Sequence, residues 1–135
     1  MTYPIKEIAD IGPETAGRLK AHGIRTTSGL LEAAKSLKGR QRLAGRIGIN
    51  EKRILGWANM ADRMRIKGVG GEYAELLQAA GVDTVKELKY RNPAKLARSM
   101  AEANEKRKLV RVLPSGRAIE RWIDHAKRLT LKITY

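Results

Sequence analysis

The sequence predicts an all-α protein made of two tandem helical units packed together. Three observations lead to this prediction: the chain repeats itself, apolar residues recur at helical spacing, and strand-like alternation is confined to "LTLKITY" at the carboxyl end. The chain has 135 residues, and a domain of about 60 residues buries only around 60% of the surface that its unfolded chain exposes. We therefore expect the two units, residues 1–63 and 64–135, to pack against each other.

The first part of the repeat has no gap. The stretch "IADIGPETAGRLKAHGIRTTSGL", residues 8–30, aligns with "IKGVGGEYAELLQAAGVDTVKEL", residues 66–88, at a constant offset of 58 residues. Gly12 falls on Gly70, and apolar, Gly and Thr positions match along the whole stretch. Such dense matching indicates two copies of one structural unit.

The later part of the repeat aligns at a larger offset. "INEKRILGWANMADRM", residues 49–64, aligns with "PSGRAIERWIDHAKRL", residues 114–129, at an offset of 65 residues, which places Trp57 on Trp122. The second copy therefore carries about seven extra residues between Leu88 and Leu113.

The first unit contains signals for successive helices. Pro13 suits the first turn of a helix that Gly23 ends. A Ser or Thr cap precedes the apolar-periodic stretch "LLEAAKSL", and "RQRLAGRIG" follows as a short basic helix. Asn50 caps a last helix in which Ile54, Trp57 and Ala61 share one face.

The second unit follows the same plan. Gly81 ends a helix, Thr84 caps the next one, and "NPAKLARSMAEANEKRKLVRV" supplies a cap and a longer helix. Ser115 caps "GRAIERWIDHAKRL". The final "LTLKITY" has no obvious strand partner, so we expect it to be frayed or to extend the last helix.

Composition excludes several classes of function. The chain has no Cys and two widely separated His residues, which argues against disulfides, a zinc finger or any other metal site. The stretch "GVGGEY" lacks the Lys-Ser/Thr ending of a phosphate-binding loop and follows no strand. No catalytic constellation is present, so we expect a protein that is not an enzyme and needs no cofactor. No apolar run is long enough to cross a membrane, and we expect a soluble, cytoplasmic protein without membrane contact.

Net charge points to a polyanionic partner. The formal net charge is +14, an excess that favours association with nucleic acid. Lys35, Lys38, Arg40, Arg42 and Arg46 precede one predicted hairpin, and a second cluster, Lys106, Arg107, Lys108 and Arg111, stands at the equivalent place in the second copy.

The repeated sequence resembles the helix-hairpin-helix motif. An apolar-Gly-apolar-Gly turn, a second helix and then Gly-Ile/Val-x-Thr occur in both "IADIGPETAGRLKAHGIRT" and "IKGVGGEYAELLQAAGVDT". Each is followed by a more degenerate hairpin, "LAGRIGINEKRILGWA" and "LVRVLPSGRAIERWID". Two hairpins joined by a helix resemble the five-helix unit at the amino end of strand-exchange recombinases and the carboxyl end of the bacterial RNA polymerase α subunit. The tandem pair resembles bacterial domains of unknown function in the same superfamily.

This resemblance implies an all-α fold of two five-helix (helix-hairpin-helix)2 units and a sequence-independent contact with the DNA backbone. The amides of a glycine turn and of the following helix start form a positive nest that can hold a phosphate. "KGVGG" keeps both glycines, whereas Asp10 replaces the first glycine of the first hairpin. The fourth hairpin has Leu113 and Pro114 where Gly48 and Ile49 stand, and we expect it to have no phosphate role.

The candidate backbone-binding residues combine these hairpins with the basic clusters and their extensions. They are Gly12, Arg46, Gly48, Lys52, Arg53, Lys67, Gly68, Gly70, Gly71, Lys106, Arg107, Lys108, Arg111 and Arg117. We expect the partner to be duplex DNA, which would make the protein nucleoid-associated. Trp57 and Trp122 fall on aligned apolar faces, so we assign them to the core and not to base stacking.

Two alternatives remain open at this point. Glu14 and Glu72 stand in the first turn after each glycine hairpin, where a carboxylate stabilises a helix start and competes with a phosphate. The hairpins would then be corners of a protein-interaction or scaffold module whose basic face meets an acidic protein. Association with RNA or the ribosome is also compatible with the charge.

Overall fold

The computed structural model describes residues 2–135 and is helical throughout its ordered elements. Within these residues the only β-type pairing is an isolated bridge between Pro4 and Thr26, so the predicted all-α class is confirmed. The elements are a short 3-10 helix, η1 (Ile5–Glu7), and eight α-helices: α1 (Pro13–Ala21), α2 (Thr27–Ala34), α3 (Leu37–Ile47), α4 (Glu51–Arg63), α5 (Gly71–Ala79), α6 (Val85–Leu88), α7 (Pro93–Arg107) and α8 (Gly116–Arg128).

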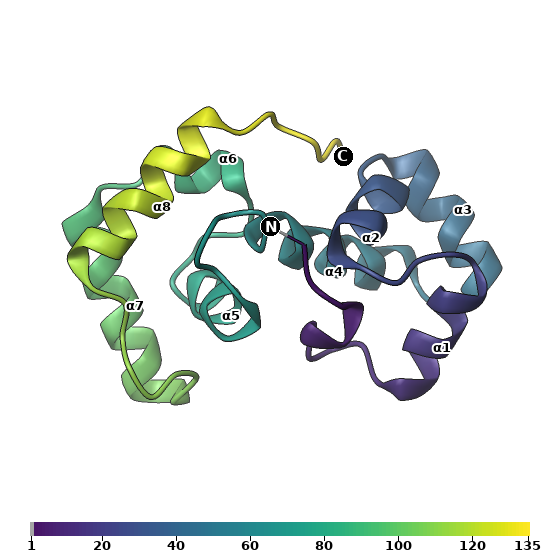
Figure 1. The fold of residues 1–135 in the computed structure, drawn as a ribbon, viewed down its shortest axis with the longest axis horizontal. Coiled ribbons are helices and arrows are strands. Elements are labelled where there is room, and N and C mark those ends of the chain that lie inside the picture. Colours follow the sequence, from purple (N-terminus) through teal and green to yellow (C-terminus); the bar gives the residue numbers. More distant parts are fainter. Residues whose placement is uncertain (1) are drawn as a thin grey trace.

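The helices form a curved row. Figure 1 shows α1, α2 and α3 at one end, α7 and α8 at the other, and α4 and α5 between them. One continuous set of buried apolar side chains runs through both halves of the chain. The division at residues 63 and 64 therefore stays a prediction, although the helices follow the repeat closely.

Helix bounds reproduce the offsets of the sequence repeat. Helices α1 and α5 begin and end 58 residues apart, and α4 and α8 begin and end 65 residues apart. The additional residues of the second half lie in α7, which has 15 residues against 11 in α3, and in the non-helical segment 108–115 that follows it.

Side-chain caps fix most helix starts, at Ser36 in addition to positions that the sequence predicts. The capping oxygen accepts a hydrogen bond from a first-turn amide at Thr26, Ser36, Asn50, Asn92 and Ser115. Thr84 is an exception, because its hydroxyl bonds to Glu87 and makes no cap. The carboxylate of Asp62, from the end of α4, accepts from the Val85 amide at 2.9 Å instead.

Helix α7 is shorter than expected. The sequence predicts helix through about residue 112, but α7 ends at Arg107 and Lys108 adopts a left-handed conformation with φ +50°. The Asn104 side chain both donates to the Val110 carbonyl and accepts from the Val110 amide. This pair of bonds replaces further helical bonds and starts the extended segment.

Two arginines of the basic sequence are core residues. Arg40 is 1% exposed and Arg63 is 2% exposed. Arg63 donates from Nε to the Ala74 carbonyl and from Nη1 to the Asp83 carbonyl, both at 2.8 Å. The end of α4 therefore holds both α5 and the turn that precedes α6.

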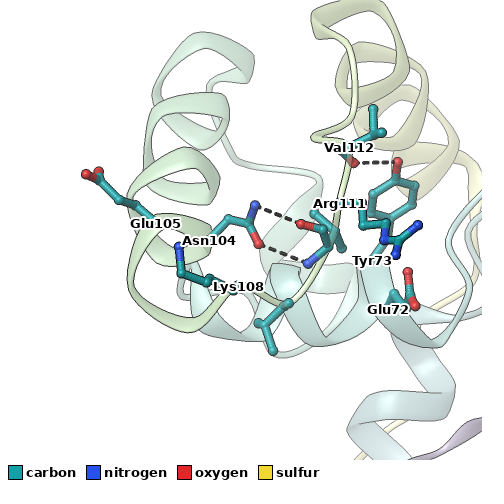
Figure 2. A pocket seen from close by; sticks show the side chains of 9 residues that line it. Glu72, Tyr73, Asn104, Glu105, Lys108, Arg111 and Val112 are labelled. Carbon is teal, nitrogen blue, oxygen red and sulfur yellow. Dashed lines mark hydrogen bonds between the residues drawn. The ribbon is translucent and has the colours of Figure 1, made fainter.

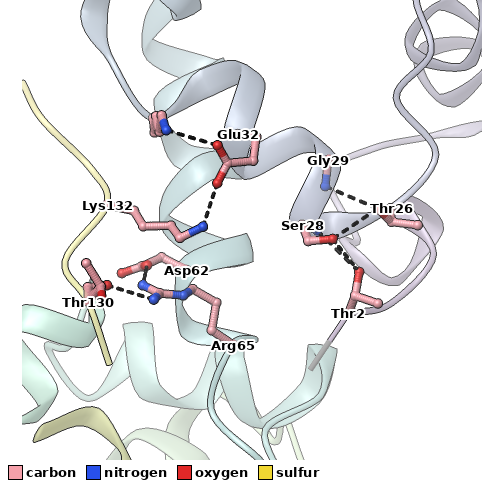
Figure 3. Close-up of polar contacts among 10 residues, drawn as sticks. Thr2, Thr26, Ser28, Gly29, Glu32, Asp62, Arg65, Thr130 and Lys132 are labelled. Carbon is pink, nitrogen blue, oxygen red and sulfur yellow. Dashed lines mark hydrogen bonds and ion pairs between the residues drawn. The ribbon is translucent and has the colours of Figure 1, made fainter. Parts of the chain in front are cut away.

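The expectation for the carboxyl-terminal segment is wrong. Residues 129–135 neither fray nor extend α8 but run back, extended, toward α2 and α3 (Figure 1). The Thr134 amide donates to the Lys35 carbonyl at 2.8 Å, and Lys132 pairs with Glu32 at 2.5 Å (Figure 3). Arg65 donates to the Thr130 carbonyl at 2.7 Å. The segment finds its polar partners at Glu32, Lys35 and Arg65, far away in the sequence, which a local sequence pattern does not reveal.

Candidate functional site

The glycine hairpin at residues 66–71 has the backbone that its sequence predicts. Gly68 has φ +89°, a conformation that L side chains rarely adopt, and Val69 is fully buried beneath the turn. The Val69 amide donates to the Ile66 carbonyl at 3.0 Å, and the Lys67 amide donates to Nδ1 of His125 at 3.1 Å. Within the cradle predicted at the Gly68 to Gly71 amides, the Val69 amide is therefore already used inside the protein, as is the preceding Lys67 amide.

Gly71 has a packing role at the start of α5. A Cβ placed on this residue would lie 2.6 Å from the Glu7 carbonyl oxygen, closer than real Cβ atoms come. A Cβ on Gly70, the N-cap residue, would meet nothing within 4 Å. Gly71 thus permits close contact between α5 and η1, whereas Gly70 faces open space.

Replacing Gly71 with alanine is expected to lower the free energy of unfolding by about 1–3 kcal/mol, because the backbone of η1 must move. The matched control is Gly70→Ser, which adds a preferred N-cap residue and should leave the free energy within about 0.5 kcal/mol of the parent. Urea unfolding of both variants measures the difference. Equal stability of Gly71→Ala and the parent would contradict the packing role.

The first hairpin differs from the second at its leading position. Asp10 accepts hydrogen bonds from Nε1 of Trp57 at 2.7 Å and from Nε of Arg53 at 3.0 Å. Arg53 also lies over the Trp57 ring, 5.6 Å from its centroid. Burial alone would raise the pKa of Asp10, but these hydrogen bonds and the Arg53 charge bring it below its usual value. The sequence predicts Arg53 as a backbone-binding residue, and the structure places it in this ion pair.

The remaining hairpin residues of the first half are exposed at helix ends. Gly12 is the extended N-cap residue of α1, and Gly48 ends α3 with φ +70°. Arg46 and Lys52 lie on either side of Gly48 with exposed side chains. The Lys52 amide is capped by Asn50 at 2.7 Å, so this position can offer its ammonium group but not its amide.

The second basic cluster lies at the end of α7. Lys106, Arg107 and Lys108 are exposed, and cations at a helix carboxyl end interact favourably with the helix dipole. Arg111 and Arg117 are exposed in and just after segment 108–115.

A cavity of about 650 Å³ brings part of this cluster beside the glycine hairpin of the second half. Lys108 and Arg111 line it together with Glu72, Tyr73 and Glu105 (Figure 2). The Tyr73 hydroxyl donates to the Val112 carbonyl at 3.0 Å and fixes the extended segment over α5. Glu72 therefore shares a cavity with two cations of the basic cluster, while Glu14 pairs with Arg18 at 2.8 Å.

Most of the predicted cations are exposed and unpaired in the part of the chain that the structure describes, a property that they share with other basic residues such as Lys86, Lys95 and Arg98. Eight of the nine are exposed and form no ion pair within residues 2–135, and Arg53 is the exception. The eight are Arg46, Lys52, Lys67, Lys106, Arg107, Lys108, Arg111 and Arg117. Arg40, which the sequence grouped with the first cluster, is buried and does not belong to this surface.

The two clusters do not form one compact patch. The first lies on and around α3, and the second lies at the end of α7 and in the segment that follows it (Figure 1). Helices α3 and α7 stand at opposite ends of the curved row, so a single partner that meets both clusters has to be extended.

Sequence reasoning missed a second cavity, formed around Gly68, Trp122 and His125. The signal was available in the repeat, because Asp10 and Gly68 are aligned and differ, while their tryptophan neighbours are both retained.

Comparison with known proteins identifies a family for this chain but no similar curated protein or solved structure. Searches of curated proteins and of solved structures returned no match. Among residues 2–135, no helix is long and apolar enough to span a membrane. The sequence profile of a family described as a domain of unknown function, DUF4332, matches residues 9–129. Because this match takes in α1 to α8 and so nearly the whole fold, the chain belongs to the DUF4332 family.

Proposed function

We propose that this protein is a non-enzymatic module that binds duplex DNA through the phosphate backbone, without reading sequence. The observation that carries the proposal is the set of eight exposed cations that lack ion-pair partners within residues 2–135. Unneutralised Lys and Arg side chains release condensed counterions when they meet phosphates, and this release drives non-specific binding. The net charge of +14 adds long-range attraction.

The separation of the two basic clusters supports an extended ligand. A duplex of about 30 base pairs is roughly 100 Å long and presents a continuous row of phosphates. We expect such a duplex to reach the ends of α3 and α7 together, and a very short duplex to reach one cluster only. Contacts confined to phosphates position a protein on DNA and carry no direct sequence information.

Binding is expected to weaken steeply with salt. In fluorescence anisotropy with a random-sequence duplex of about 30 base pairs, the dissociation constant should rise by more than tenfold between about 50 and about 200 mM salt. The triple variant Lys106→Glu, Arg107→Glu, Lys108→Glu should bind about tenfold or more weakly at the lower salt concentration.

The matched control carries the same change in net charge elsewhere. Lys86→Glu, Lys95→Glu, Arg98→Glu reverses three exposed cations on α6 and α7 that lie outside the proposed interface. If both triple variants weakened DNA binding equally, the cluster at the end of α7 would not be part of the interface. A parent protein whose affinity does not depend on salt would overturn the DNA proposal itself.

A second candidate function is a protein-interaction module in which the hairpins are only corners. The observation that favours it is the internal use of the hairpin, where the Lys67 and Val69 amides are bonded and Gly71 packs on η1. In this case the basic residues would meet an acidic protein. DNA retention unchanged by the α7 triple variant would favour this function over the first.

A further inference from the structure

The two tryptophans occupy the same position in two matching helices but differ in their hydrogen bonding. Trp57 is the seventh residue of α4 and Trp122 the seventh of α8, and they are 2% and 4% exposed. Nε1 of Trp57 donates to the Asp10 carboxylate at 2.7 Å. No acceptor for Nε1 of Trp122 is found among residues 2–135, and the indole borders a cavity.

The missing acceptor is explained by the repeat. Asp10 is aligned with Gly68, which has no side chain. A Cβ built on Gly68 would meet only Nε1 of Trp122, at 3.3 Å. The second half thus keeps the donor and removes the carboxylate that would accept from it.

The cavity beside Trp122 is much larger than its counterpart in the first half. It has a volume of about 860 Å³, against about 280 Å³ for the hollow lined by Asp10, Arg53 and Trp57. Both are lined by aligned residues of the two copies. The larger one also has an apolar wall, Val112, Leu113 and Pro114, from the non-helical segment 108–115. A volume in this range is typical of sites for small organic ligands.

The walls of this cavity are also more basic than those of the hollow lined by Asp10, Arg53 and Trp57. Lys67 and Arg121 stand where the first copy has Ala9 and Gly56, and Arg128 lines the same cavity. Asp124 is the acidic residue in the lining. The cations outnumber it, so the cavity favours a negatively charged occupant.

His125 adds a neutral donor to this lining. Its Nδ1 accepts from the Lys67 amide at 3.1 Å, which leaves the ring proton on Nε2. Burial, together with the positive charges of Arg128, Arg65 and Lys67, holds the pKa of His125 below its usual value. The ring is therefore uncharged at neutral pH, and the Lys67 backbone stays fixed beside the cavity.

We propose that the cavity between Gly68, segment 112–114 and α8 binds a small organic acid. One carboxylate oxygen accepts from Nε1 of Trp122, in the role that Asp10 fills for Trp57, while Lys67 and Arg121 balance the charge. The apolar body of the acid lies against Val112, Leu113 and Pro114. The Tyr73 hydroxyl holds this wall through its bond to the Val112 carbonyl. The inference does not depend on DNA binding.

The test uses the two indole N–H signals in a ¹H–¹⁵N correlation spectrum of the full chain, with phenylacetate as the probe. We expect the Trp122 signal to move and saturate, whereas the Trp57 signal, already bonded to Asp10, stays in place. Trp122→Phe identifies the signals by deleting one of them. Phenylacetamide, which has the same shape and no charge, should bind at least about tenfold more weakly, because hydrogen bonds to charged groups are stronger.

Arg121→Gln is expected to weaken phenylacetate binding about tenfold, because it removes one charge-assisted contact with the carboxylate. Lys127→Gln, also exposed on α8 but outside the cavity lining, is the matched control and should bind as the parent does. The proposal is overturned if neither indole signal moves, if both move alike, or if the amide binds as well as the acid. Equal shifts with inorganic phosphate would overturn the assignment to an organic acid.

Discussion

Replacing Arg63 with alanine is expected to lower the free energy of unfolding by about 3–5 kcal/mol. The guanidinium group is 2% exposed and satisfies the Ala74 and Asp83 carbonyls at 2.8 Å. Its removal takes a charge-assisted hydrogen bond from the buried Ala74 carbonyl and from the partly buried Asp83 carbonyl, and it opens a cavity between α4 and α5. Burial lowers the pKa of Arg63 to about 10, so the group remains charged at neutral pH and its hydrogen bonds are charge-assisted.

Chemical denaturation monitored by circular dichroism measures this effect. Arg128→Ala is the matched control, since Arg128 is aligned with Arg63 in the repeat but is exposed at the end of α8. We expect the control to change the free energy of unfolding by less than about 0.5 kcal/mol. A similar small change for Arg63→Ala would show that α4 does not hold the second half through this side chain.

Replacing Arg40 with methionine is expected to cost about 2–4 kcal/mol of stability, the second large effect. Arg40 donates to the Ala34 carbonyl at 3.0 Å, to the Thr134 carbonyl at 2.9 Å and to the Glu51 carboxylate at 2.7 Å. Methionine fills much of the space but supplies none of these donors, so buried acceptors lose their partners. Thermal unfolding compared with Arg42→Met, an exposed position on the same helix, measures the cost.

A truncation separates the two roles of Arg40. Deleting residues 130–135 removes Thr134, Lys132 and their contacts but leaves the bonds of Arg40 to Ala34 and Glu51. We expect this deletion to cost less than Arg40→Met, and the two changes together to cost less than their sum, because they share the Thr134 contact. Strict additivity would mean that the terminal segment and Arg40 are not coupled.

Much of the fold could be predicted because its signals are local. The repeat offsets reproduce the bounds of α1 and α5 and of α4 and α8, and the caps at Thr26, Asn50 and Ser115 form as their residue types predict. The burial of both tryptophans follows from helical periodicity. These features depend on neighbours within a few residues.

The candidate site was predicted less completely. Eight of the cations that the sequence predicts as backbone-binding residues are exposed and form no ion pair within the described residues. The ninth, Arg53, pairs with Asp10. Sequence reasoning also could not separate Arg40 from Arg42, because both are arginines on a basic helix and only the packing of α2, α3 and the terminal segment decides which one is buried.

The sequence by itself determined the helices, their repeat, the glycine turn at Gly68 and the excess of positive charge. The tertiary structure alone decided which amides and cations are free, where residues 129–135 lie, and that Trp122 borders a basic cavity. The physical reason is the range of the interactions. Capping and periodicity act within one or two helical turns, whereas a buried arginine or an unpaired indole depends on groups tens of residues away in the chain.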